Sequence, residues 1–448
     1  MAQLSGYKGL SFVAKESPLF LLFAKNSAVA MISHMPNTND ETNERDHRRI
    51  GKELGLFTFS DTVGKGLPLW TAKGTALRRV LERFIVDEEI RRGYQHVTTP
   101  DIAKIDLYKK SGHYPYYKDS MYAPVDIDGE LFMLRPMSCP HHFELYLSQP
   151  HSYRDLPLRI AEMAKMYRYE LSGVLSGLVR VREFCLSDAH IICADKKQAA
   201  EEVSKVLDLI EYFSGIFGLR KTEDYWYRLS LGNRADSKKF YKDDAAWDEA
   251  EEVLCDTLKR RGEKFAKAEK EAAFYGPKID VQMKDVRGQE NTAFTVQYDF
   301  VMPKRFKLVF TGTDGAQKEA VVIHRSAVGA LERLIAFLIE KYNGAFPLWL
   351  APVQVKVLPV GEKFLAYALK VHEALLAADV RSELDDSNET LGKKVRTAKL
   401  EKVPYWIVVG EKEEKEETVT LESRAGAKEV FSLEAAATKL QKEIQDKR

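Results

Sequence analysis

The chain has 448 residues, of which 45% are hydrophobic and 30% are charged, and its formal net charge is +1. This length suggests roughly two or three domains, each large enough for a core of its own. The near-zero net charge excludes a polybasic chain that holds nucleic acid by overall attraction, while a local basic face is compatible with it.

Cysteine content and hydropathy argue against a disulfide-rich or membrane-spanning protein. Four cysteines in 448 residues are too sparse for a disulfide scaffold, and there is no CxxC pair, so we expect a reducing, cytoplasmic compartment. No run of about 18 apolar residues occurs, so no membrane span is expected. Residues 17–24 are apolar and follow Lys8 and Lys15, a weak likeness to a secretory signal. We expect instead that residues 1–45 are a disordered extension or the product of an upstream start, with Met35 as initiator.

Hydrophobic periodicity in the next 300 residues alternates between helical and extended patterns. Irregular distances between the strand-like runs favour an antiparallel sheet flanked by helices, an α+β unit over residues 46–346. The predicted elements in chain order are a helix over 71–93, a short strand over 97–100, a helix over 196–214, strands over 279–283, 293–298 and 321–323, and a helix that starts after His324.

The pattern changes after residues 344–352, which contain two prolines and mark a domain boundary. Strands and helices then alternate at short distances, the pattern of a small α/β domain over residues 347–448. Its predicted strands cover 353–358, 380–384 and 403–409, and its predicted helices cover 364–378, 391–400 and the end of the chain.

Neither common phosphate-binding loop is present, since the chain has no GxxxxGK[ST] and no GxGxxG after a strand. Three other stretches are similar to the signature motifs of class II aminoacyl-tRNA synthetases. The helix 71–93 with the following residues to Pro100 resembles motif 1, residues 157–173 around Arg168 resemble motif 2, and residues 329–333 resemble motif 3. Motif 1 forms the dimer in that class, so the resemblance implies a homodimer.

Further runs are more specific to one family of that class. Together they resemble the threonyl-tRNA synthetases, and the resemblance implies a class II catalytic domain over residues 46–346, an anticodon-binding domain over 347–448, and a reaction that joins threonine to threonine tRNA with ATP. The runs are 46–51, 135–142, 152–159, 188–193, 273–279, 323–325 and 350–355.

Formation of an aminoacyl adenylate brings two anions together, so charge shielding and positioning supply most of the catalysis. A planar guanidinium can hold a carboxylate and a phosphate together. The resemblance assigns Arg168 to the α-phosphate and Arg180 to the γ-phosphate, with Mg²⁺ on the ATP. It assigns Glu170 to the adenine amino group, Arg333 to the adenine ring or the bent phosphate tail, and Gln297 to the ATP cleft.

The resemblance also implies one Zn²⁺ per chain, held by Cys139, His190 and His324, with His142 as a weaker alternative ligand. Three protein ligands leave positions open for a substrate. In the family, the amine and hydroxyl of threonine occupy them, so valine, which lacks the hydroxyl, would be rejected. Asp188 would accept a hydrogen bond from the same hydroxyl.

The remaining candidates have individually weaker signals. Tyr275 and Lys278 would line the substrate cleft, and His113 would be the base for transfer to the ribose of the tRNA. Asn388 and Arg424 would read anticodon bases.

Two departures from the family pattern stand out. Leu186 replaces a usual Gln and Ser187 a usual acidic residue, so one polar contact to the substrate is missing or supplied elsewhere. The chain also has only 45 residues before Asp46, so we expect no editing domain in it and formation of some seryl-tRNA. The competing interpretations are a synthetase of the same class for another amino acid, such as proline or serine, and a non-catalytic paralogue that binds tRNA or regulates another enzyme.

Overall fold

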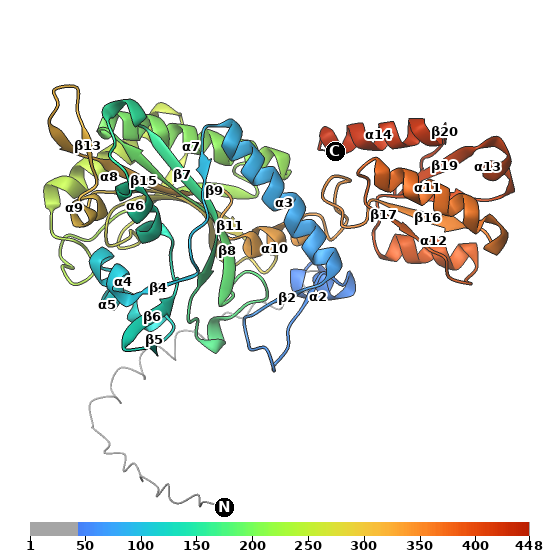
Figure 1. Ribbon diagram of the computed structural model, residues 1–448, viewed down its shortest axis with the longest axis horizontal. Helices are drawn as coiled ribbons and strands as arrows, with labels where there is room; N and C mark the ends of the chain where they lie inside the picture. The colour runs from blue at the N-terminus through green and yellow to red at the C-terminus, as the bar shows by residue number, and fades with distance from the viewer. Residues whose placement is uncertain (1–43, 448) are drawn as a thin grey trace, which may run out of the picture. The chain divides into compact units, whose positions relative to one another are not determined.

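The structure, a computed structural model, describes residues 44–447 (Figure 1). The expectation for the extension 1–45 therefore falls almost wholly outside the described residues. Within residues 44–447, no helix combines the length and the apolar character needed to cross a membrane.

An eight-stranded sheet forms the centre of the larger domain (Figure 1). Its strand order is β10-β9-β11-β12-β15-β8-β7-β3. The six strands from β9 to β7 pair antiparallel, and parallel pairs close the two edges. The predicted antiparallel sheet is confirmed. Its strands are β3 (Gln95–His96), β7 (Leu158–Tyr167), β8 (Glu183–Cys193), β9 (Tyr225–Ser230), β10 (Phe265–Ala268), β11 (Lys278–Lys284), β12 (Glu290–Asp299) and β15 (Val321–Ser326).

The longest helices bury the apolar faces that the sequence pattern indicated. Helix α3 (Ala72–Arg91) begins where the Thr71 side chain accepts from the Gly74 amide, an N-cap that satisfies one unpaired donor of the first turn. Helix α7 (Lys196–Ile216) starts in the same way at Asp195. It packs beside α8 (Asp244–Arg260) and against β15, β12 and β8, while α10 (Leu331–Lys341) packs against β8.

Two predicted boundaries differ from the structure. Residues 97–100 are not a strand, because the short strand β3 ends at His96 and the Thr99 amide and hydroxyl turn to the Glu162 carboxylate. The helix expected directly after His324 begins only at Leu331. Strand β15 continues to Ser326, and Gly329 then turns the chain with a φ of +66°, a conformation that favours glycine.

Short elements surround the large sheet. The three-stranded sheet β4-β6-β5 and the two-stranded pairs β1-β2 and β13-β14 are all antiparallel. The strands are β1 (Phe57–Thr58), β2 (Leu69–Trp70), β4 (Ile102–Lys104), β5 (Val125–Ile127), β6 (Glu130–Leu134), β13 (Val309–Thr311) and β14 (Gln317–Glu319), and the helices are α2 (His47–Glu53), α4 (Ile105–Ser111), α5 (His113–Tyr116), α6 (Cys139–Leu147) and α9 (Met302–Phe306).

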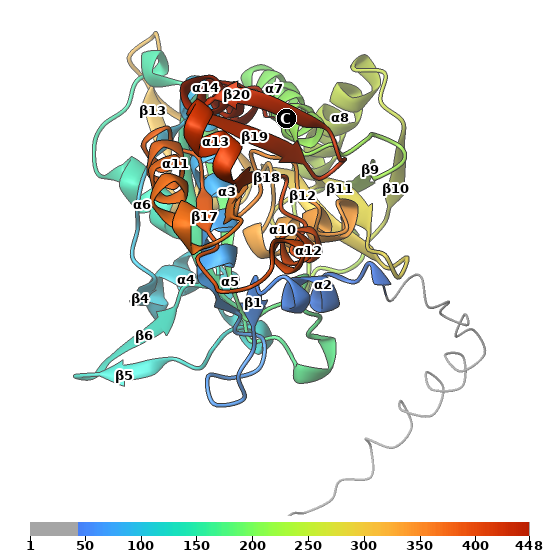
Figure 2. The same ribbon diagram turned by 90° about the vertical axis from the view of Figure 1, so that its right-hand side faces the viewer.

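The C-terminal domain is a five-stranded mixed sheet in the order β17-β16-β18-β19-β20, with helices against it (Figure 2). The first three strands in that order are parallel and the last two pair antiparallel. The elements are β16 (Val355–Pro359), α11 (Leu365–Ala377), β17 (Ser382–Leu384), α12 (Leu391–Leu400), β18 (Tyr405–Val409), α13 (Glu411–Glu416), β19 (Thr418–Ser423), β20 (Lys428–Ser432) and α14 (Leu433–Gln445). The predicted α/β alternation is confirmed, and the hairpin β19-β20 is an addition to it.

Candidate functional site

One row of residues crosses four neighbouring strands of the large sheet. Lys278 on β11 pairs with Gln297 on β12, Gln297 pairs with His324 on β15, and His324 pairs with His190 on β8. Residues paired in this way point to the same face of a sheet, and neighbouring strands lie about 4.8 Å apart. The register therefore aligns four of the predicted site residues, which come from distant parts of the sequence.

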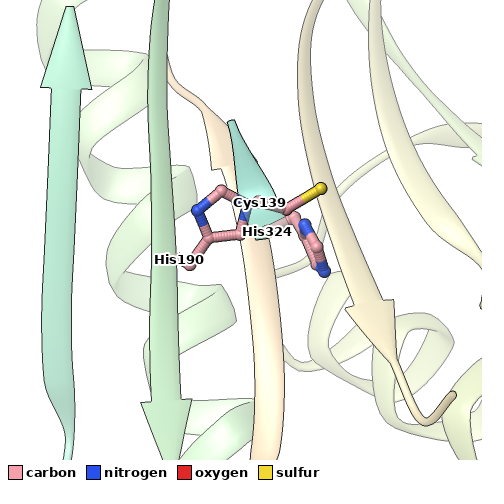
Figure 3. A group of neighbouring side chains, drawn as sticks. All are labelled: Cys139, His190 and His324. Carbon is pink, nitrogen blue, oxygen red and sulfur yellow. The ribbon is translucent and has the colours of Figure 1, made fainter. Parts of the chain in front are cut away.

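Cys139 joins this row from the first turn of α6. The thiol of Cys139 and one ring nitrogen each of His190 and His324 lie within 4.8 Å of one another, and all three residues are buried (Figure 3). One sulfur and two imidazole donors are the mixture that Zn²⁺ binds in proteins. The donor set and its compactness therefore fit the predicted metal. We call these three residues the metal cluster, after the ion that they are predicted to bind.

The two histidines of this cluster have a hydrogen-bond partner at one ring nitrogen each. His324 Nε2 lies 2.8 Å from Asp299 Oδ2, and His190 Nδ1 lies 2.8 Å from His142 Nδ1. The other ring nitrogen of each is then the one left for a metal. Burial, with the neighbouring His324 and His142, holds the pKa of His190 well below its usual range, so the ring is neutral, as a metal ligand must be.

Negative groups surround the thiol. Burial raises the pKa of Cys139 well above its usual value, and Asp188 and Asp299 raise it further. Burial also raises the pKa of Asp188, although Ser138 donates a hydrogen bond to its carboxylate. A cation at this position would reverse the effect on Cys139 and favour the thiolate.

Three arginines converge beside the metal cluster. Arg180 Nε donates to Glu170 Oε2 over 2.9 Å, and the Arg168 guanidinium lies over the ring of Phe184. Arg333 donates to the carbonyls of Val179 and Thr292. Burial first, and then repulsion by Arg168 and Arg180, lowers the pKa of Arg333 to about 10. This end of the site has excess positive charge, which an anion would neutralise.

A cavity of about 540 Å³ connects the metal cluster with Arg168 and Arg180. A second hollow of about 290 Å³ continues from it past Arg333. Both hollows contact Arg168, Glu170, Arg180 and Gln297. The larger one is also lined by the predicted residues His113, Cys139, Asp188, His190, Tyr275, Lys278 and His324.

Three predicted residues have specific partners inside this cavity. The Tyr275 hydroxyl donates to Gln297 Oε1, and its ring stacks on His324 with centroids 4.9 Å apart. Lys278 Nζ lies 2.9 Å from Asp280 Oδ2. These contacts fix the wall of the cavity between the metal cluster and the arginines.

Comparisons with known proteins agree with this geometry. Residues 122–342 match the family model of the tRNA synthetase class II core domain (G, H, P, S and T), and residues 354–443 match that of the anticodon binding domain. A crystal structure described as the RNA binding domain of threonyl-tRNA synthetase from Cryptosporidium parvum Iowa II is 35% identical with a TM-score of 0.83, and the alignment covers 89% of this chain and 98% of that one. The chain belongs to the threonyl-tRNA synthetase family.

Relatives named threonine–tRNA ligase share more identity but are longer. The protein from Geobacillus sp. (strain WCH70) is 48% identical over 406 residues, which are 90% of this chain and 62% of the relative. The protein from Bacillus velezensis is 49% identical over 375 residues, 84% of this chain and 58% of the relative. The chain thus spans about three fifths of the length of these two relatives.

In this synthetase fold, His113 is buried against the metal cluster. The residue is only 2% exposed, and His113 Nε2 lies 3.9 Å from Cys139 Sγ. Its Nδ1 lies 2.7 Å from Ser111 Oγ, whose hydroxyl donates to the Tyr108 carbonyl over 3.0 Å. Ser111 therefore accepts from His113 Nδ1, and His113 Nε2 is left as an unprotonated nitrogen facing the cavity.

The two anticodon candidates lie in different surroundings. Asn388 is exposed in the loop before α12. The guanidinium of Arg424 donates to the backbone carbonyls of Lys402, Ala345 and Phe346. The structure does not bring these two residues into one hydrogen-bonded group, and a base contact at Arg424 would compete with those carbonyls.

Sequence reasoning missed the carboxylates behind the metal cluster. Asp299 and Glu162 belong to none of the predicted roles, yet Asp299 contacts His324, and Glu162 contacts His142 at 3.1 Å. Asp299 is at the end of β12, two positions after Gln297, and only the strand register brings it to His324. A carboxylate in an apolar run, such as Glu162 in β7, was the available signal, because buried carboxylates need partners.

Proposed function

We propose that this chain is a threonine–tRNA ligase, which forms threonyl adenylate from threonine and ATP and transfers the threonyl group to the 3′ end of threonine tRNA. One observation carries the proposal: a cavity joins the Cys-His-His cluster to Arg168 and Arg180, and an adjoining hollow continues past Arg333. The first group suits a small amino acid with donor atoms, and the second suits a polyphosphate. The longer relatives named threonine–tRNA ligase support the same reaction.

The amino acid would be selected at the metal cluster. Cys139, His190 and His324 would hold one Zn²⁺, which supplies open coordination positions for the amine and hydroxyl of threonine. Asp188, which is buried and faces the same cavity, would accept a hydrogen bond from the hydroxyl. Valine offers a methyl group in place of that oxygen, so its rejection would not depend on the ~1–3 kcal/mol that a hydrophobic pocket distinguishes per methylene.

The adenylate would form at the arginine end. A carboxylate oxygen of threonine attacks the α-phosphorus, and the bond from that phosphorus to pyrophosphate breaks. Arg168 lines both hollows, so its guanidinium could hold both the carboxylate and the α-phosphate. Arg180 would hold the γ-phosphate of the Mg²⁺–ATP complex, and Arg333 would stack on the adenine ring or hold the bent phosphate tail. Glu170 and Gln297 would contact the nucleotide, with Glu170 at the adenine amino group.

The second step needs a base at the ribose of the tRNA. His113 Nε2 is the unprotonated nitrogen of a neutral ring, because burial first, and then His324, Arg305 and Arg168, lower the pKa of His113 well below its usual range. It would accept the proton of the attacking hydroxyl. Tyr275 and Lys278 would position the substrate through the wall they form.

The tRNA would also contact the C-terminal domain, where Asn388 and Arg424 are the proposed base-reading residues. We further propose a homodimer, from the motif 1 likeness of α3, and a reducing compartment such as the cytoplasm, since the four cysteines are unpaired. Serine has the amine and hydroxyl that the metal recognises, so it loses only a methyl contact, and the chain by itself would reject it by roughly 10–200-fold at most.

The test is ATP–pyrophosphate exchange with threonine, serine, valine and proline, each with and without a zinc chelator, followed by charging of threonine tRNA. We expect exchange with threonine, weaker exchange with serine, and little with valine. Exchange with proline alone would indicate another synthetase of the class. Absence of exchange in a zinc-loaded chain would indicate a non-catalytic tRNA-binding paralogue. Exclusion of serine by several thousand-fold would contradict the proposed basis of selection.

A further inference from the structure

The hydrogen bond between His190 and His142 contains one proton, so one of the two rings is the donor and the other is the acceptor. The two Nδ1 atoms are 2.8 Å apart, and the rings are nearly perpendicular, with centroids 4.8 Å apart. Both residues are buried, His190 at 1% exposure and His142 at 0%. A neutral imidazole donates at one nitrogen and accepts at the other. The partner of the remaining His142 nitrogen therefore decides which ring donates.

That partner is Glu162, which receives hydrogen bonds from three further donors. Its oxygens accept from the Thr99 amide at 3.1 Å, the Thr99 hydroxyl at 2.8 Å and Arg135 Nη1 at 3.1 Å. Burial by itself would raise the pKa of Glu162, but the bonds from His142 and Thr99 and the charge of Arg135 lower it to about 2. Glu162 is thus an ionised acceptor.

The ionised Glu162 carboxylate determines the donor and the acceptor in both hydrogen bonds, His142–Glu162 and His190–His142. His142 Nε2 lies 3.1 Å from Glu162 Oε2 and must donate to it. A His142 ring with a single N–H then accepts at Nδ1. His190 then donates from its own Nδ1, and its Nε2 is an unprotonated nitrogen. That nitrogen is the one that remains for the metal cluster with Cys139.

We propose that Glu162 and His142 form a hydrogen-bond relay that fixes the tautomer and ring orientation of His190 for metal binding. This inference rests on the zinc site of the proposed function and assigns positioning roles to two residues outside the ligand set. Partners of metal-bound histidines typically change metal affinity by about 10–100-fold when they are replaced.

The other histidine of the cluster, His324, contacts its carboxylate without an intervening ring. His324 Nε2 contacts the Asp299 carboxylate directly at 2.8 Å, and Asp299 Oδ1 accepts from the amides of Val301 and Met302. His324 is thereby left with Nδ1 for the metal, whereas His190 is left with Nε2. His142 is an extra ring inserted between His190 and its carboxylate, so the two ligands would present different nitrogens to the same ion.

Two substitutions test the relay. In Glu162→Gln, the amide oxygen suits the Thr99 amide and Arg135, so the amide NH₂ faces His142 and reverses the direction of both bonds. In His142→Phe, the ring volume stays and the acceptor for His190 is removed. His141→Gln is the matched control, because His141 is a buried neighbour on the same helix and neither of its ring nitrogens has a hydrogen-bond partner within residues 44–447.

The primary measurement is zinc affinity by competition with a chromogenic chelator. We expect Glu162→Gln and His142→Phe to bind zinc about 10–100-fold more weakly than the wild type, and His141→Gln to stay within threefold. The second measurement is solid-state NMR of the zinc-free wild-type chain labelled with ¹⁵N-histidine, in which single-histidine variants assign the signals. It should show His142 protonated at Nε2 and His190 protonated at Nδ1.

These measurements separate failure of the relay from failure of the metal site. A wild-type chain that binds no zinc overturns both proposals. A wild-type chain that binds zinc, with both relay variants within threefold of it, overturns only the relay. Protonation of His142 at Nδ1 in the wild type overturns the relay as well, even if the variants fail to fold.

Discussion

The two ends of the cavity are built in opposite ways. At the end with the metal cluster, here called the metal end, each histidine has a hydrogen-bond partner. The groups come from the central strands β8 and β15 and the start of α6. At the arginine end, the pKa of Arg333 is lowered by burial and by the nearby Arg168 and Arg180. The first end is organised before any ligand binds, whereas the second has unbalanced charge until a polyanion arrives. The first end is therefore held by hydrogen bonds, and the second end has excess positive charge.

The largest expected effect is at the metal end. Cys139→Ser removes the only sulfur donor of the cluster, so threonine activation should fall on the order of a thousand-fold, more than the ~10–100-fold expected for a partner of a ligand. ATP binding should change little, because the arginine end is separate. The measurements are zinc content, pyrophosphate exchange and ATP titration, with Cys255→Ser as the control. Loss of ATP binding in the variant would break the proposed separation of the two ends.

Arg168→Ala should show the reverse pattern. It removes the guanidinium that would hold the carboxylate and the α-phosphate, so kcat for adenylate formation should fall by about 100–1,000-fold. Zinc content should remain at one ion per chain. Arg168→Lys should recover little, because an ammonium lacks the planar fork. Full activity in the lysine variant would show that only the charge matters.

A smaller effect is expected at Arg180. Its side chain is 51% exposed and pairs with Glu170, so its proposed contact with ATP would be screened by water. Arg180→Ala should raise the KM for ATP by about fivefold, in line with ~1 kcal/mol for an exposed charged contact, and leave kcat nearly unchanged. Steady-state exchange at varied ATP checks this. A large fall in kcat would place Arg180 in the transition state with Arg168.

The last prediction concerns acid stability, rather than activity, at the metal end. The pKa of Glu162 falls from 4.5 to about 2 on folding. As the pH decreases below 4.5, the unfolded chain binds a proton that the folded chain does not, so this carboxylate's contribution to the free energy of unfolding is lost progressively toward pH 2. The Tm difference between the wild type and Glu162→Gln, followed by calorimetry of zinc-free protein, should therefore shrink from pH 5 to pH 3. A constant difference would contradict an ionised Glu162.

The sequence was informative where local patterns matched the tertiary structure. Helices α3 and α7 were predictable from their apolar spacing, and the family runs identified Cys139, His190 and His324. The hairpin β19-β20 was missed because its alternation of polar and apolar residues is short and highly charged. Asp299 and Glu162 could not be assigned, because their roles depend on which strands are neighbours in the sheet, and local residue order does not determine that.

The row Lys278–Gln297–His324–His190 limits where insertions and deletions can be tolerated in the sequence. Inserting or deleting one codon within β12 or β15 would turn every following side chain of that strand to the opposite face. The polar side chains of the row would then point into the hydrophobic interior, and the apolar side chains of the same strand would line the cavity. Variation in length should therefore collect in connections such as the hairpin at Gly288, while the strands themselves tolerate only substitutions.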